Sequence, residues 1–134
     1  MIRITLALIA LVGIIIFFGG CTSEPAQGAV EGVVLINGQP GTKVRVEFHP
    51  DERKGTQGSS SFAETDAEGH FNLVGPVAVG WHKVVVQDMK LAQSETGRGV
   101  QVRFGPEYAK VLTTPLDAEV KPGAQSITIE VPKK

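Results

Sequence analysis

KVRVEFH, residues 43–49, alternates polar and apolar side chains along its whole length. Its apolar members are Val44, Val46 and Phe48. Successive side chains of a β-strand point to opposite faces of the sheet, so a period of two gathers the apolar set on one face. The stretch therefore predicts a strand that is buried on one side, and it favours an all-β fold.

The sequence on both sides of this strand repeats the pattern. AVEGVVLI, residues 29–36, predicts a strand that ends at Asn37-Gly38, a dipeptide that tolerates positive φ in a hairpin turn. Further strands are predicted at residues 61–65, 70–74, 81–88, 100–104, 116–120 and 126–131, and a helical turn at residues 106–110. Sixteen glycines and eight prolines fit short strands joined by turns. About seven strands in roughly 110 residues predict an antiparallel Greek-key β-sandwich.

The three histidines do not form a predicted metal site. Alternation places His49 and His70 on outward faces and His82 on an inward face. The sequence also lacks an HxH motif and a cysteine at a zinc-ligand spacing from histidine. We therefore expect structural or solvent-exposed histidines and no metal.

The acidic segment Asp66-Ala67-Glu68-Gly69 faintly resembles a calcium loop, but the further oxygen ligands of such a loop are missing. A β-turn in which Asp66 bonds the local backbone and Gly69 takes positive φ is the prediction.

Catalytic motifs are absent from the sequence. The serines at 59–61 lie in a predicted loop without a G-x-S-x-G elbow, and no phosphate-binding or dinucleotide-binding loop occurs. We expect neither an enzyme nor a cofactor. The formal net charge of −1 and the scattered basic residues also exclude a nucleic-acid partner.

The N-terminus predicts a signal peptide over residues 1–20. Met1–Arg3 are cationic at the start, and Ile4–Phe18 carry no charge, a run too short for a typical spanning helix. Gly19 and Gly20 before the lone Cys21 resemble the lipobox of bacterial lipoproteins, in which the cysteine thiol receives a diacylglycerol. In that pattern the third residue before the cysteine is usually aliphatic, and here it is Phe18. The alternative is an uncleaved anchor with an incidental Cys21.

Residues 21–28 then predict a lipidated cysteine and a short polar tether, which contains Pro25. Residues 29–134 predict the folded domain. The lipid would hold this domain at a bacterial membrane, on the extracytoplasmic side.

VEGVVLINGQPGTKVRVEFHP, TDAEGHFNL and GWHKVVVQD resemble the carboxypeptidase-regulatory-like domain of the transthyretin-like (prealbumin) superfamily. The matching positions are Val30, Gly32, Val34, Gly38, Pro40, Thr65, Asp66, Gly69, Phe71, Gly80, Val84 and Val86. The resemblance covers roughly residues 29–131, and His82 stands where the family usually has tyrosine. It implies a seven-stranded sandwich without catalytic residues.

The function expected from these features is that of a non-enzymatic structural or protein-binding module, anchored in the cell envelope by lipid on Cys21. One alternative is a carbohydrate-binding module in which Trp81 and Tyr108 supply aromatic surfaces for sugar rings, beside the loop at residues 51–61. Another is an accessory subunit of an envelope enzyme or transporter. The expected partners are therefore the membrane and either envelope proteins or polysaccharide.

Overall fold

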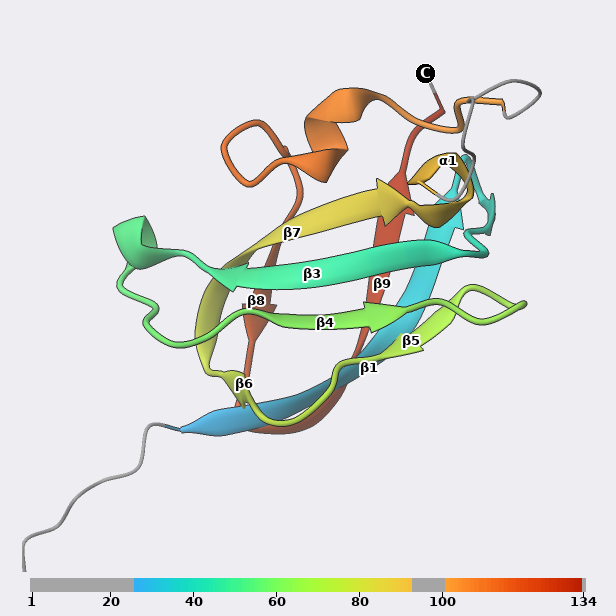
Figure 1. The fold of residues 1–134 in the computed structure, drawn as a ribbon. Coiled ribbons are helices and arrows are strands. Elements are labelled where there is room, and N and C mark those ends of the chain that lie inside the picture. Colours follow the sequence, from blue (N-terminus) through green and yellow to red (C-terminus); the bar gives the residue numbers. More distant parts are fainter. Residues whose placement is uncertain (1–25, 93–100, 134) are drawn as a thin grey trace, which may run out of the picture.

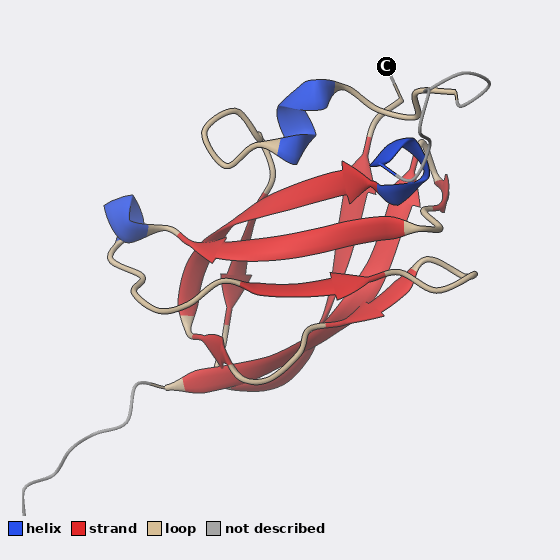
Figure 2. Ribbon diagram, in the orientation of Figure 1, coloured by secondary structure: helices blue, strands red, loops and turns tan. Residues whose placement is uncertain are grey.

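The computed structural model describes residues 26–92 and 101–133, which form two β-sheets around one apolar core (Figure 1). The first sheet consists of β1 (Gln27–Ile36), β2 (Gln39–Pro40), β5 (His70–Asn72), β6 (Val77–Ala78) and β9 (Gly123–Val131). The second has the order β4 (Ser61–Glu64), β3 (Val44–Pro50), β7 (Gly80–Asp88) and β8 (Asp117–Val120). The described helical segments are short: η1 (Glu52–Lys54), α1 (Met89–Ala92) and η2 (Pro106–Ala109) (Figure 2).

The all-β prediction is confirmed, but the strand count and one pairing direction differ from it. The described residues contain nine strands, because two short stretches, residues 39–40 and 77–78, form additional strands that pair with β1. β1 is antiparallel to β2, β5 and β6 but parallel to β9, with a register that runs from Gly28↔Gly123 to Ile36↔Val131. The first sheet is therefore mixed rather than purely antiparallel.

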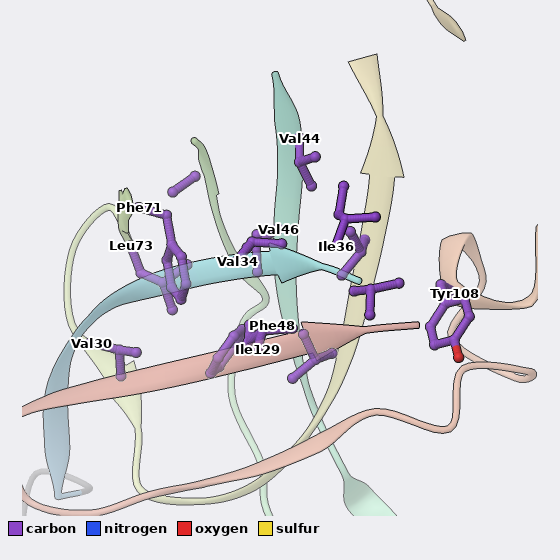
Figure 3. Packing of buried hydrophobic residues seen from close by; sticks show 14 of the residues in the cluster. Val30, Val34, Ile36, Val44, Val46, Phe48, Phe71, Leu73, Tyr108 and Ile129 are labelled. Carbon is purple, nitrogen blue, oxygen red and sulfur yellow. The ribbon is translucent and has the colours of Figure 1, made fainter. Parts of the chain in front are cut away.

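The core is built from the inward faces that the alternation predicted (Figure 3). Val44, Val46 and Phe48 of β3 are each fully buried. The ring of Phe48 lies 6.3 Å from that of Phe71 on β5, so the two sheets are in aromatic contact across the core. Burial of these side chains is the main favourable contribution to folding.

The predicted turns are confirmed by the backbone. Asn37 and Gly38 have φ values of 50° and 78°, as a turn after β1 requires. Gly69 has a φ of 79°. The Asp66 carboxylate accepts hydrogen bonds from the backbone N–H of Glu68 at 3.0 Å and of His70 at 2.8 Å. The acidic segment is therefore a side-chain-supported β-turn between β4 and β5.

The prediction of a strand at residues 100–104 is wrong for residues 101–104, which the structure describes and which have no strand conformation. Val102 is half exposed, whereas Arg103 turns toward the body of the domain. Its guanidinium donates to both carboxylate oxygens of Asp88 at 2.7 Å and to the Thr42 carbonyl at 2.8 Å. Side-chain anchoring thus replaces the backbone pairing that the alternation predicted.

The domain begins earlier than predicted. β1 starts at Gln27, and residues Gln27 and Gly28 pair with Ala78 and Val77 of β6. The last two residues of the predicted tether therefore belong to the sheet. The predicted signal peptide and Cys21 lie outside the described residues.

Candidate functional site

Trp81, one of the two aromatic residues expected to contact a ligand, lies at the start of β7 and is 37% exposed. The ammonium of Lys54 lies 4.2 Å from the centroid of its ring, and the same ammonium is 3.3 Å from the Asp117 carboxylate. One face of the indole therefore already has a cationic partner within the chain. A sugar ring would have to use the opposite face or displace Lys54.

Tyr108 is not available as a second stacking surface. It lies in η2, is only 7% exposed and belongs to the core (Figure 3). Its ring packs edge-on against Phe104, with 6.2 Å between the ring centroids. The structure therefore assigns Tyr108 a packing role that joins η2 to the sandwich.

Cys21, the predicted lipidation residue, lies outside the described residues. Among the helices of residues 26–92 and 101–133, none has the length and apolar character needed to cross a bilayer.

The histidines are separated as predicted. His70 is exposed, His49 is partly exposed, and His82 is completely buried. Within residues 26–92 and 101–133, no three histidine, cysteine, aspartate or glutamate side chains are grouped so that they could hold a metal ion.

His82 is a buried polar residue inside the apolar core. Its ring lies 5.9 Å from the ring of Phe48, and its Nδ1 is 3.0 Å from the Gly80 carbonyl oxygen. Nε2 is buried and has no hydrogen-bond partner among the residues that the structure describes. Burial lowers the pKa of His82 below its usual value near 6.5, and the contact with the Gly80 carbonyl opposes this shift.

This burial predicts that acidification destabilises the fold. The lowered pKa means that the unfolded chain binds a proton more readily than the folded chain does. The stability that depends on neutral His82 is therefore fully retained above about pH 6.5. It is lost as the pH drops from there toward the pKa of His82 in the folded chain. We expect the urea midpoint to fall between pH 7 and pH 5, and to fall less in His82→Phe. Equal pH profiles for the two proteins would contradict this assignment.

The outward face of the second sheet carries a line of polar contacts that the sequence reasoning missed. Ser60 Oγ lies 2.9 Å from Nδ1 of His49, and Nε2 of His49 lies 3.0 Å from Glu47 Oε2. A carboxylate can only accept, so Nε2–H of His49 donates to Glu47. When the imidazole is neutral, Nδ1 then accepts from the Ser60 hydroxyl. Arg45 continues the line, with its Nε 2.9 Å from Glu47 Oε1 and its guanidinium over the Phe62 ring. The alternation in residues 43–49 places three of these side chains on one face.

This serine, histidine and glutamate have the connectivity of a hydrolase triad, but their surroundings differ from those of a strong catalytic site. Ser60 is exposed, and the side chains of His49 and Glu47 are 25% and 19% exposed. Electrostatic stabilisation of a transition state is largest in a site that excludes water. The contacts are better explained as a surface network that orders the β3–β4 edge.

A polar groove lies between the first sheet and the β4–β5 turn, with a volume of about 560 Å³. Its polar lining residues are Glu31, Glu64, Asp66, His70, Asn72 and Ser126. The hydrogen bond from the His70 backbone N–H is the main cause that keeps the pKa of Asp66 below its usual value. Three carboxylates make this groove a surface that favours cationic or hydroxyl-rich groups.

The chain has few detectable similarities to known proteins. No protein-family model and no curated protein matches it. Among solved structures it is similar to the crystal structure of a DUF3823 family protein from Parabacteroides merdae, with a TM-score of 0.46 and 17% sequence identity. The alignment covers 82% of this chain and 48% of that chain, so the chain spans about half the length of that protein.

Proposed function

We propose that the chain is a non-enzymatic binding or structural module, held at the outer side of a bacterial membrane by lipid on Cys21. The observation that carries this proposal is the order of segments at the N-terminus: a cationic start, an uncharged run over Ile4–Phe18, then Gly19-Gly20-Cys21. A thiol is the nucleophile that acceptance of a diacylglyceryl group requires. Two acyl chains provide stable membrane binding, whereas a single chain binds only marginally.

The short separation along the sequence between Cys21 and the first strand supports this arrangement. Five residues, 22–26, separate the cysteine from the start of β1 at Gln27. Fully extended, they reach about 17 Å. The end of the sandwich where β1 starts would therefore lie next to the membrane, and the opposite end, with the turn at Asn37-Gly38, would face outward (Figure 1).

We also infer that the sandwich has a Greek-key, transthyretin-like topology. The chain alternates between the sheets, crossing from β2 to β3, from β4 to β5, from β6 to β7 and from β8 to β9. Gly38 and Gly69 of the family-like motif occupy turns with positive φ, which is the role that such glycines serve.

Replacement of Cys21 by alanine tests the membrane proposal. We expect the wild-type chain to incorporate labelled palmitate and to sediment with the membrane fraction. Cys21→Ala should incorporate no label, because it lacks the acceptor thiol. Ser23→Ala is the matched control and should behave as the wild type. A wild-type chain that takes up no palmitate would refute lipidation.

A further inference from the structure

The outer edge of β9 has no partner among the described residues. β9 pairs only with β1, which lies on one of its two sides. No backbone hydrogen bond within residues 26–92 and 101–133 engages its other side. A nine-residue edge of this kind is long enough to add another strand, and proteins usually protect such edges.

The register shows which residues offer their backbone groups at this edge. The Val131 carbonyl accepts from Asn37 N–H at 2.8 Å, so the backbone of Val131 points toward β1. The N–H and C=O of one strand residue point to the same side, and the side alternates along the strand. The residues that point away from β1 are therefore Ala124, Ser126, Thr128 and Glu130, whose side chains are all exposed.

Two prolines mark the ends of this edge. Pro122 and Pro132 continue the same every-second-residue series, so their nitrogens would also point away from β1. As prolines they have no N–H to donate. The available edge is thus the run between them, and its midpoint is Ile127. A run with such symmetric limits can pair with a copy of itself in antiparallel orientation so that Pro122 of one copy lies opposite Pro132 of the other.

We propose that β9 pairs in this register with β9 of a second copy of the chain. Ser126 then lies opposite Thr128, and Ala124 opposite Glu130, each as a hydrogen-bonded pair. The two-fold symmetry repeats each of these pairs, which gives four pairs in total. Each pair contributes two interchain hydrogen bonds, so the ladder contains about eight. The ladder joins the first sheets of the two copies into one continuous sheet.

The side chains of this edge suit self-pairing. The Ser126–Thr128 pair joins two hydroxyl side chains, a favourable cross-strand combination. Glu130 lies opposite alanine rather than a second carboxylate. Ile127, which is only partly buried in one copy, meets Ile127 of the other copy at the symmetry axis and gains burial. Lys121 of one copy lies opposite Lys133 of the other, and these two like charges are outside the paired run, beyond the prolines.

The surface area that a single strand pair buries is below that of a typical stable interface. The association is therefore weak, and the fraction of dimer changes with protein concentration. The inference does not rest on lipidation.

Sedimentation velocity of the full chain in detergent tests the proposal over a range of concentrations. We expect a monomer–dimer equilibrium for the wild type. Thr128→Pro should weaken it about tenfold or more, because it removes an edge N–H from two pairs. This N–H does not bond β1, so the fold should persist. Thr128→Val keeps the N–H and loses only the side-chain hydroxyl, so it should dimerise more tightly than Thr128→Pro. A wild type that stays monomeric, or equal affinities for both variants, would overturn the proposal.

Cysteine pairing tests the register independently of the proline variant. Ser126→Cys mixed with Thr128→Cys should form an intermolecular disulfide, since hydrogen-bonded pairs place their Cα atoms about 5.5 Å apart. Either variant alone should form no more disulfide than the wild type, because like positions are then more than about 7 Å apart. No excess disulfide in the mixture would overturn the assigned register and, with it, the symmetric pairing.

Discussion

Arg103→Ala is expected to lower the free energy of unfolding by about 3–5 kcal/mol. The Arg103 guanidinium donates to both oxygens of the Asp88 carboxylate, and the side chain of Asp88 is only 4% exposed. Removal of the cation leaves a buried carboxylate without its guanidinium partner. It also releases the Thr42 carbonyl, to which Arg103 donates at 2.8 Å. Urea unfolding followed by circular dichroism measures the loss.

Arg45→Ala is the control for this variant. Arg45 also pairs with a carboxylate, that of Glu47, but both side chains are more exposed, at 32% and 19%. Exposed ion pairs contribute about 0–1 kcal/mol, so a small loss is expected. Comparable losses for the two arginine variants would show that the buried Arg103–Asp88 pair contributes no more to stability than a more exposed pair does.

Gly32→Ala is expected to destabilise the domain by about 3 kcal/mol. A Cβ at this position would collide with the Ile127 backbone carbonyl oxygen and would lie 2.8 Å from the Phe71 ring. The carbonyl belongs to β9, which is paired with β1 along its whole length, so it cannot move without separating the two strands. The added methyl group therefore introduces strain in place of a favourable contact.

Ala29→Val, three residues earlier on β1, is the matched control because its side chain points to solvent. We expect a change within about 0.5 kcal/mol. Strand propensity favours the larger side chain at both positions, so only the close approach of β9 predicts the difference. A neutral Gly32→Ala would mean that β1 and β9 are farther apart than described.

The sequence was a good guide wherever burial alone decides conformation. The alternation in residues 43–49 correctly assigned the inward residues of β3, and the same rule placed His82 on an inward face. Asn37-Gly38 marked a turn because few other dipeptides accept positive φ at both positions. These features depend on local steric preferences and on one buried face.

Features that depend on distant partners were not predictable in this way. The parallel pairing of β9 with β1 joins strands about ninety residues apart, and no local pattern encodes its direction. Residues 101–104 alternate like a strand, yet the ion pair between Arg103 and Asp88 determines their path. The line from Ser60 to Glu47 likewise requires that the loop after η1 return to β3.

The mass of the mature protein, purified from membranes, tests the central claim most directly. Lipoprotein processing predicts a chain that begins at Cys21, with the added mass of a diacylglyceryl group on its thiol. A chain that begins at Met1, or one that contains Cys21 without added mass, would contradict the account of a lipid-anchored module.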